Sequence, residues 1–408
     1  MKNLLFLAHR IPYPPNKGDK IRSCHLLHYL SRAYRVYLGS FIDDPSDWAH
    51  TGTLKSLCAE TRFVALHPLR AHVRSLAALA SGEPLSVRYY WSQALKHWVD
   101  GLLNAGAIER VLIFSSAMAQ YLPAILPEGI RRVIDFVDMD SEKWRQYSRS
   151  KPWPMSWIYA REGASLFAFE RRQAMLSEAS VFVSEAEAGL FKTQAPETAE
   201  RVTYLENGVD TEYFAPHRCY PNPYPEDGRI LVFTGAMDYW ANVDAVCWFA
   251  KEVFPAVQAR LADARFYIVG AKPTAAVRGL TEIPGVFVTG AVEDVRPYLA
   301  HATAAVAPLR IARGVQNKVL EAMAMAKPVL ATREAMEGIR ADPQLRGLIV
   351  QGPEQAIACA LSLLNGPEQG IGELARQSVL RGYNWKENLT RIIQLLEGTH
   401  SVNTLGTR

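Results

Sequence analysis

The feature that most constrains the fold of this 408-residue chain is the regular alternation of short apolar runs with longer amphipathic stretches. Short apolar runs predict buried strands, and the stretches between them predict helices. In the first half, strands are expected at residues 4–8, 34–41, 62–66, 111–115, 133–137 and 181–184. Strands that alternate with helices form parallel sheets covered on both faces, so we expect an α/β protein.

The same pattern starts again after residues 216–228, a stretch rich in proline and polar residues that is expected to be a linker. The second half has expected strands at 230–234, 266–269, 286–289, 304–308 and 329–332, and expected helices at 243–261, 317–326, 355–364 and 372–380. We therefore expect two Rossmann-like doubly wound domains facing a cleft, an acceptor domain at 1–215 and a donor domain at 216–382. Residues 383–408, a helix and a polar tail, are expected to pack back on the first domain.

Composition argues against several classes of protein. The formal net charge is only +4 and no dense run of Lys or Arg occurs, so no nucleic-acid partner is expected. The five cysteines are scattered and no two histidines have the spacing of a zinc site, so we expect no metal and a reducing cytoplasm. No run approaches the ~20 apolar residues of a transmembrane helix. We expect a cytoplasmic protein that could work at the inner face of the cytoplasmic membrane.

The segment RGVQNKVLEAMAMAKPVLAT, residues 313–332, is the strongest indication of a ligand site. It follows one expected strand and opens a helix, so free backbone N–H groups and the helix dipole would attract an anion. Lys318 lies in the first helical turn, and Glu321 follows on the same face. N–H groups and a lysine suit a diphosphate, and a carboxylate suits the hydroxyls of a ribose. The N–H groups in question belong to Gly314, Val315, Gln316 and Asn317.

A plainer interpretation of the same segment is a Lys–Glu pair on a helix surface, which contributes roughly a few tenths of a kcal/mol. The position after a strand, in a repeated α/β pattern, makes this alternative less attractive. It stays open from these residues alone.

The segment GVQNKVLEAMAMAKPVLAT resembles the donor site of the retaining, two-domain (GT-B) glycosyltransferases of family 4, also called glycosyl transferases group 1. ENGVDTEYF (206–214) is similar to the end of that family's N-terminal domain, and FTGAMDYWANVDAVCWF (233–249) to the start of its donor domain. PYPPNKGDKIRS, DFVDMDSEKW and GAMDYWANVDA resemble a bacterial subgroup of sugar transferases associated with exopolysaccharide and exosortase (PEP-CTERM) systems.

This resemblance implies a nucleotide-diphospho-sugar as co-substrate, no further cofactor, no obligatory metal, and transfer with retention at the anomeric carbon. Lys318 would match the phosphate-binding lysine and Glu321 the ribose-binding glutamate. The family often has an acid eight residues before this glutamate, where this chain has Arg313. It also often has Arg and Lys after the first donor-domain strand, where this chain has the loop 235–240 with neither. Arg310 or Arg313 is therefore the candidate for the missing charge, and Arg313 is a candidate catalytic residue beside Lys318.

Other candidate residues lie at the ends of expected strands. On the donor side these are Gly235, Met237 and Gly270, and in the first domain Gly18, which matches a family glycine that approaches the donor phosphate. Asp19, Lys20 and His9 are expected on the acceptor side, with a plain helix start and a structural histidine as alternatives. Asp135, Asp138 and Asp140 lie at and after the strand RVIDFVD, and Asp138 is the candidate acid or base. The alternative is that these acids cap the next helix.

Two segments, residues 69–98 and 141–175, mix basic and aromatic side chains, which suits an anionic membrane surface. Their alternative is a pair of long helices with aromatic residues in the core. Taken together, the sequence predicts a glycosyltransferase that transfers sugar to a lipid-linked or glycan acceptor in exopolysaccharide or cell-envelope glycan synthesis. The rival hypotheses are a nucleotide-sugar epimerase or phosphorylase on the same fold, and a non-catalytic nucleotide-sugar-binding scaffold subunit.

Overall fold

The computed structural model describes residues 1–15, 18–225, 228–312, 315–366 and 370–399, and the chain forms two compact units. Unit 1 consists of Met1–Glu206 together with the chain from Lys386 onwards, and unit 2 is Asn207–Trp385. The boundaries lie at 206/207 and 385/386, where the sequence predicted 215/216 and 382/383. The proline-rich stretch expected to link the domains is therefore part of unit 2.

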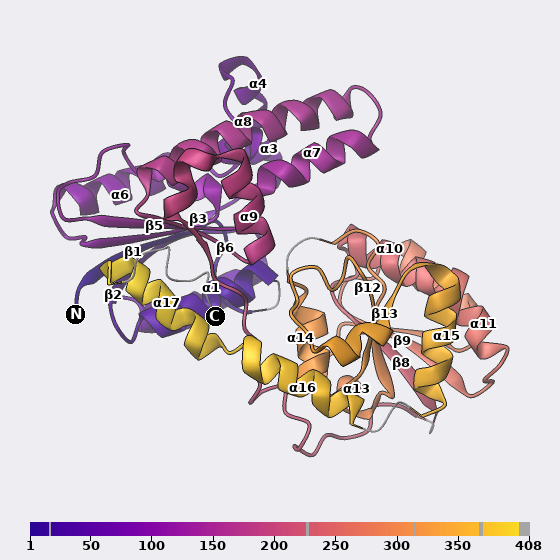
Figure 1. Cartoon of the computed structure of the whole chain (residues 1–408). Coiled ribbons are helices and arrows are strands. Elements are labelled where there is room, and N and C mark those ends of the chain that lie inside the picture. The colour runs from indigo at the N-terminus through magenta and orange to yellow at the C-terminus, as the bar shows by residue number, and fades with distance from the viewer. Residues whose placement is uncertain (16–17, 226–227, 313–314, 367–369, 400–408) are drawn as a thin grey trace. The chain divides into compact units, whose positions relative to one another are not determined.

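Unit 1 is built on a seven-stranded parallel sheet with the order β3-β2-β1-β4-β5-β6-β7 (Figure 1). Its strands are β1 (Asn3–Ala8), β2 (Arg35–Ile42), β3 (Glu60–Ala65), β4 (Arg110–Phe114), β5 (Arg131–Val137), β6 (Ala179–Phe182) and β7 (Val202–Tyr204). The strand order reverses between β1 and β4. In open α/β sheets, ligands bind at such a reversal, beyond the carboxyl ends of the strands.

Helices cover the sheet of unit 1, and a serine side chain caps the start of two of them. They are α1 (Gly18–Leu30), α2 (Thr51–Leu57), α3 (Pro68–Leu76), α4 (Ala78–Ser81), α5 (Leu85–Tyr89), α6 (Gln93–Asn104), α7 (Asp140–Ser150), α8 (Met155–Leu176), α9 (Glu185–Gln194) and α17 (Trp385–Glu397). Ser184 begins α9 because its hydroxyl accepts the N–H of Glu187 at 3.2 Å. Apolar residues of α6, α8 and α9 form one core with the strands.

Helix α17 returns to unit 1 through polar contacts of its last turn. The carboxylate of Glu397 accepts hydrogen bonds from Tyr34 at 2.7 Å and from Arg110 at 3.0 Å. Arg131 donates from Nε to the carbonyl of Leu395 at 2.6 Å. These partners lie near the amino ends of the strands, away from the edge where ligands are expected.

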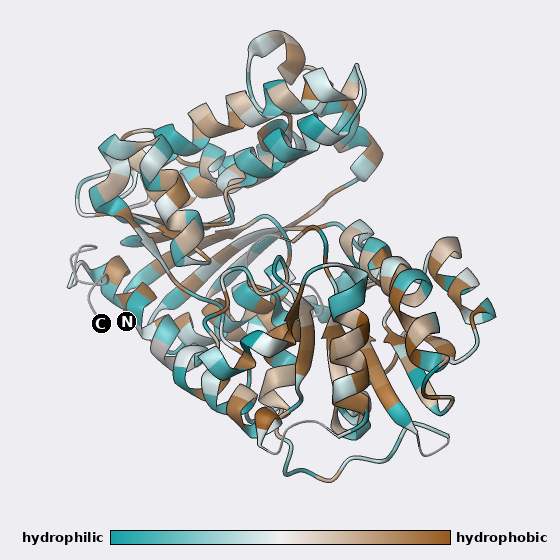
Figure 2. Cartoon of the chain, turned by 45° about the vertical axis from the view of Figure 1, so that its right-hand side comes forward, coloured by the Kyte–Doolittle hydropathy of each residue, from teal (hydrophilic) through white to brown (hydrophobic). Residues whose placement is uncertain are grey.

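Unit 2 has a second parallel sheet with the order β10-β9-β8-β11-β12-β13. Its strands are β8 (Arg229–Thr234), β9 (Ala264–Val269), β10 (Val286–Gly290), β11 (Ala304–Ala307), β12 (Val329–Thr332) and β13 (Ile349–Val350). Its helices are α10 (Trp240–Trp248), α11 (Phe254–Gln258), α12 (Ala275–Arg278), α13 (Arg296–His301), α14 (Asn317–Ala324), α15 (Gly352–Leu364) and α16 (Ile371–Gly382). Figure 2 shows the apolar residues concentrated in these strands. The order reverses between β8 and β11.

The α/β class expected from the sequence is confirmed: each of the two units is built on a parallel sheet covered by helices. One expected helix, 243–261, is divided into α10, a π-helical turn (Phe249–Val253) and α11. Pro255 explains the division because it has no N–H for the helical ladder and its ring crowds the preceding turn. Strands β7 and β13 were not predicted, because two or three residues are too few to show a periodic pattern.

No helix in the ranges that the structure describes is both long enough and apolar enough to span a membrane.

Candidate functional site

The candidate ligand site of unit 2 lies where its strand order reverses, beyond the carboxyl ends of β8 and β11. Helix α14 follows β11 and begins with Asn317, and its N-cap residue Gln316 makes no side-chain capping bond to the helix. The first backbone N–H groups of an α-helix have no intrahelical acceptor, and the helix dipole adds partial positive charge there. This end of α14 therefore suits an anion.

Lys318 is held in the first turn of α14 by two neighbours from the strand and helix of the adjacent crossover. Its Nζ donates to Asn242 Oδ1 at 2.5 Å and lies 4.9 Å from the ring centroid of Phe233. Asn242 is itself oriented, since its Nδ2 donates to the carbonyl of Ala236 at 2.8 Å. Burial lowers the pKa of Lys318 from 10.5 to about 8, although Glu321 opposes this shift. The protein thus compensates the ammonium charge only in part.

Glu321 lies one turn further along α14 and is half-buried. Burial raises its pKa from 4.5 to about 7, with Lys318 acting in the opposite direction. Both groups of the pair therefore have pKa values displaced towards neutrality. Displaced pKa values of this kind are typical of functional sites, where charged side chains are buried without full compensation by the protein.

Two glycines let the backbone segments of the site approach one another. A Cβ on Gly270 would lie 1.7 Å from the carbonyl oxygen of Gly235, and a Cβ on Gly235 would lie 2.8 Å from Asn242 Nδ2. The loop after β8 is fixed further by the N–H of Met237, which donates to the carbonyl of Ala271 at 2.8 Å. Met237 itself is fully buried. Gly235, Gly270 and Met237 thus shape the wall next to Lys318, and Met237 supports it from inside.

The remaining donor-side candidates make contacts with residues other than Lys318 and Glu321. Arg310 pairs with Asp244 of α10, its Nε 3.0 Å from Oδ2, and half of its side chain is exposed. Its charge is therefore already partly compensated, although an exposed pair of this kind is weak and could open. Val315 is buried, and Asn317 Oδ1 accepts from Asn207 Nδ2 at 3.4 Å. Arg313 and Gly314 lie outside the described residues.

A cavity of about 930 Å³ lies in unit 2, and none of the candidates from the sequence lines it. Arg296 contacts two other lining residues of this cavity. Its guanidinium carbon lies 3.6 Å from the ring centroid of Tyr213, and its Nη2 lies 2.6 Å from Asp294 Oδ2. Burial raises the pKa of Tyr213, and so do the nearby carboxylates Asp294 and Glu321. Neither Lys318 nor Glu321 lines the cavity, and Tyr213 is the lining residue whose pKa Glu321 influences. The lining also includes Tyr220, Tyr298, Pro221, Pro223 and Val292.

Two residues of this site, Asn242 and Tyr213, were not predicted from the sequence. Asn242 is a polar residue among apolar residues at the start of α10. A polar residue in such a position can indicate a functional side chain, and this pattern was present in the sequence. Tyr213 belongs to the segment ENGVDTEYF that carries part of the family resemblance. Its neighbours in the cavity come from distant positions in the chain, so no spacing rule would have grouped them.

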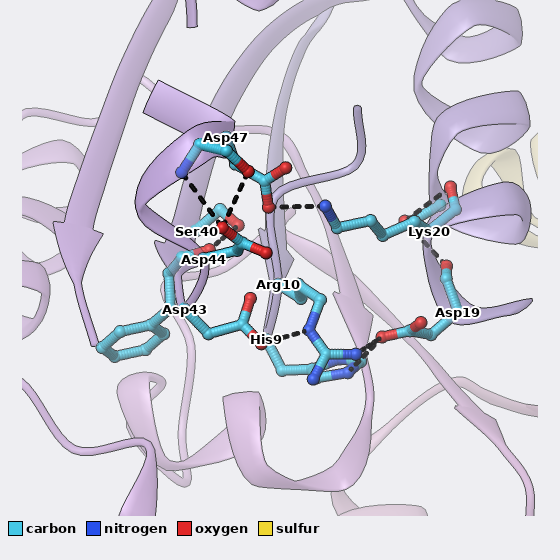
Figure 3. Close-up of polar contacts among 11 residues, drawn as sticks. His9, Arg10, Asp19, Lys20, Ser40, Asp43, Asp44 and Asp47 are labelled. Atoms are coloured by element: carbon cyan, nitrogen blue, oxygen red, sulfur yellow. Dashed lines mark hydrogen bonds and ion pairs between the residues drawn. The ribbon is translucent and has the colours of Figure 1, made fainter. Parts of the chain in front are cut away.

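Unit 1 has a polar network at the carboxyl end of β1, beside the reversal between β1 and β4 (Figure 3). The ring of His9 stacks on Phe114 with centroids 5.8 Å apart, and its Nε2 lies 3.1 Å from Asp19 Oδ2. Arg10 bridges two acids: its Nη1 lies 2.6 Å from Asp19 Oδ2 and its Nε 3.0 Å from Asp43 Oδ2. Burial favours a raised pKa for Asp19, but the hydrogen bond with His9 and the charge of Arg10 hold that pKa well below its usual range.

Of the four unit 1 residues predicted near a ligand, the structure brings His9 and Asp19 together. Lys20 is instead directed into the protein, where its Nζ forms a 2.6 Å ion pair with Asp47 and only 2% of the residue is exposed. This buried pair corrects the expectation that Lys20 faces an acceptor, because its charge is already compensated. Gly18 is the first residue of α1, which also fits the plain helix start.

Asp138 follows β5, and its pKa is raised to about 7 by burial and by the neighbouring Glu187. Its neighbour Asp135 is structural, since it forms a fully buried 2.8 Å ion pair with Arg22. The alternative that these acids cap α7 is wrong: Met139 occupies the N-cap position without a side-chain bond, and its N–H donates to Glu187 at 2.8 Å. Among the described residues, no three His, Cys, Asp or Glu side chains are grouped closely enough to hold a metal ion.

Comparisons with known proteins give a family match for part of the chain and structural neighbours for nearly all of it. Residues 228–365 match the family model of the glycosyl transferases group 1. No curated protein sequence matches the chain. Its structure is similar to a glycosyltransferase from Rickettsia africae, at 13% identity and a TM-score of 0.63 over 97% of this chain and 98% of that one.

Two further solved structures are similar over nearly the whole chain. WaaG, a glycosyltransferase of lipopolysaccharide biosynthesis, has 16% identity and a TM-score of 0.65 over 97% of this chain and 100% of its own. Anabaena HepE, solved with UDP and glucose, has 14% identity and a TM-score of 0.64 over 97% and 100%. The chain therefore has the two-domain GT-B fold of these glycosyltransferases, and its segment 228–365, which holds Lys318 and Glu321, matches the glycosyl transferases group 1.

Proposed function

We propose that this protein is a retaining glycosyltransferase that moves a sugar from a nucleotide-diphospho-sugar to a lipid-linked or glycan acceptor in exopolysaccharide or cell-envelope synthesis. The observation that carries this proposal is the Lys318–Glu321 pair at the strand reversal of unit 2, whose pKa values are displaced to about 8 and about 7. The pair lies within the segment that matches the glycosyl transferases group 1. Retention and the type of glycan rest on the sequence resemblance.

In this proposal, Lys318 and the first N–H groups of α14 hold the diphosphate of the donor. Negative charge grows on the diphosphate as the bond to the sugar breaks, and a fixed cation beside it lowers the barrier. Asn242 keeps the ammonium aimed at the same place by its hydrogen bond at 2.5 Å. The close packing of Gly235 on Gly270 leaves the backbone free to approach the phosphates without an intervening side chain.

The ribose and the base of the donor would continue along α14 into the cavity. Glu321 accepts hydrogen bonds from the ribose hydroxyls, for which its carboxylate must be ionised. The ring of Tyr213 and the planar Arg296–Asp294 pair then provide flat surfaces for a base. HepE, a solved structure similar to this chain, holds UDP, which supports a nucleoside diphosphate as the ligand class.

For the acceptor we propose the polar network of unit 1. His9 can donate to or accept from a sugar hydroxyl, according to its tautomer, and Asp19, which Arg10 keeps ionised, can accept from one. Asp138, with a pKa of about 7, is the candidate for proton transfer in that unit. In retaining transferases of the resembling family, the leaving diphosphate can itself take the proton of the acceptor, so a protein base is not essential.

The first test is calorimetric titration with UDP, GDP, ADP, TDP and CMP. We expect one nucleoside diphosphate to bind, and Glu321→Gln to weaken its binding by about tenfold, as expected for a lost hydrogen bond to a charged group. Glu334→Gln changes an exposed carboxylate of the same unit and is the matched control. If the two variants bind alike, the assignment of the ribose site is wrong.

The second test separates the transferase from its rivals. The corresponding labelled nucleotide-sugar is incubated with and without a lipid-linked glycan acceptor, and the anomeric configuration of the product is read by NMR. Label transferred only when the acceptor is present, with the configuration kept, supports the proposal. Conversion of the donor without acceptor supports an epimerase, consumption that requires phosphate supports a phosphorylase, and binding without turnover of any kind supports a scaffold subunit.

A further inference from the structure

Helix α3 of unit 1 has the reverse of the usual pattern for a helix on a protein surface. Its large apolar residues face outward: Leu69 is 84% exposed, Val73 71% and Leu76 58%. The residues that it buries are small, Ala71 and Ser75. A surface helix normally buries its large apolar side chains, because their removal from water stabilises the fold. The outer face of α3 therefore contributes little to folding and is available for a partner.

A second group of exposed apolar residues lies at the start of helix α8. Trp153 is 81% exposed, Trp157 56% and Met155 39%. Three other aromatic residues of α7 and α8 do not belong to this exposed group. Trp144, Tyr147 and Tyr159 pack against one another and are half-buried. Of the residues at 141–175 that the sequence suggested for a membrane surface, we therefore retain only these few exposed side chains at the N-terminal end of α8.

Helices α3, α4 and α8, which carry the two groups, belong to the same part of unit 1 (Figure 1). Arg161 of α8 joins them: its guanidinium donates to the carbonyl of Ala78 in α4 and, at 3.2 Å, to that of Glu83. Trp157 is one helical turn before Arg161 on the same face of α8. Leu79, 36% exposed, follows Ala78 on α4. We call the set Leu69, Val73, Leu76, Leu79, Trp153, Met155 and Trp157 the apolar face.

Within the two stretches of chain that carry the apolar face, the charged residues have one sign. Residues 67–82 contain two arginines and no acidic residue, and residues 143–161 contain five basic residues and no acidic residue. Arg70, Arg149 and Lys151 are exposed beside the apolar face. The acids that flank these two stretches are already bonded within unit 1: Glu83 to Arg88, Glu142 to Arg145, and Glu162 to the N–H groups of Leu85 and Ser86. This combination matches a partner that is apolar within and negatively charged at its surface.

We infer that the apolar face docks on the surface of an anionic lipid bilayer. Aliphatic side chains of an amphipathic helix enter the boundary between headgroups and acyl chains, and tryptophans prefer that same depth. Exposed arginines and lysines at the rim contact the anionic headgroups. A second copy of this chain fits less well, because the basic rims of two copies would meet and repel each other.

The test is co-sedimentation of the full chain with vesicles. We expect binding to vesicles of equal parts phosphatidylglycerol and phosphatidylcholine, and at least tenfold weaker binding to vesicles of phosphatidylcholine alone. The double variant Val73→Glu, Leu76→Glu should bind the anionic vesicles at least tenfold more weakly than the wild type. Since both side chains are exposed in the folded protein, the variant should fold, and its far-UV circular dichroism and melting temperature check this.

The matched control is Ile125→Glu, which changes an apolar residue of unit 1 that is 87% exposed but lies outside the apolar face. It should bind the vesicles like the wild type. Equal binding by the double variant and the wild type would overturn the inference, as would equal binding to the two kinds of vesicle. A wild type that is dimeric in sedimentation equilibrium, with a monomeric double variant, would also overturn it and assign the apolar face to self-association.

Discussion

Replacing Lys318 by methionine tests the donor site most directly, because methionine keeps most of the side-chain volume and removes only the charge and the donors. Burial lowers the pKa of Lys318 from 10.5 to about 8 even with Glu321 nearby. At neutral pH the side chain is still mostly protonated, so the wild type presents a cation that the protein compensates only in part. A bound diphosphate would complete that compensation in the wild type. In the variant there is no ammonium charge for the diphosphate to compensate.

The expected magnitude follows from the contacts. One hydrogen bond to a charged group contributes about 1.5–3 kcal/mol when its partner is lost. The ammonium shares its site with Asn242 and the ring of Phe233, so it offers a diphosphate at most two further N–H donors. We therefore expect a loss of about 3 kcal/mol in the free energy of diphosphate binding, which is roughly a hundredfold in Kd.

Isothermal titration calorimetry with the nucleoside diphosphate and with the free nucleoside measures this loss. Lys318→Met should weaken the diphosphate about a hundredfold and leave the nucleoside nearly unchanged. The control is Lys251→Met, which removes an exposed lysine of the same unit and should change neither. Equal losses for nucleoside and diphosphate would show that Lys318 supports the fold of the site rather than the phosphates, and the reasoning would then be refuted.

Three further predictions use other parts of the structure. With the pKa of Glu321 raised to about 7 and that of Lys318 lowered to about 8, titrations across pH should show tightest binding of the nucleotide-sugar between these values; above pH 8 the affinity should fall about tenfold per unit as Lys318 loses its proton. Gly270→Ala places a Cβ 1.7 Å from a carbonyl oxygen and should lower the free energy of unfolding by about 2–3 kcal/mol in urea titrations, whereas Gly279→Ala, with no atom within 4 Å, should be near neutral. Asp135→Asn removes the carboxylate charge that pairs with the buried guanidinium of Arg22 and should cost about 3–5 kcal/mol of unfolding free energy by the same measurement; a loss below about 1 kcal/mol would contradict the structural role of that pair.

The periodic pattern of the sequence was sufficient for the fold class and for most of the strands. Alternation of apolar runs and helices is a local property, and it fixes parallel sheets through the length of the crossovers. For the same reason, the position of the segment from Val315 to Glu321 after a strand follows from the sequence pattern alone. The short strands β7 and β13 and the division of one helix at Pro255 depend on packing and were missed.

Within the candidate sites, the sequence identified residue types but not their partners. Lys20 and Asp19 are adjacent in sequence and were both expected to face an acceptor. In the structure, Lys20 forms a buried ion pair with Asp47, while Asp19 joins His9 and Arg10. Adjacent residues at a helix start point about 100° apart, so one can be buried while the other faces the sheet edge.

By itself, the sequence determined the α/β class, the two repeated halves and the Lys318–Glu321 pair, because each of these follows from spacing along the chain. Only the tertiary structure decided that Asn242 orients Lys318, that Tyr213 and Arg296 line a common cavity, and that α3 presents leucine and valine to the outside. Those features bring together residues from separate crossovers. Their contacts, burial and pKa values exist only once the sheets and helices have packed, which is why no local pattern could reveal them.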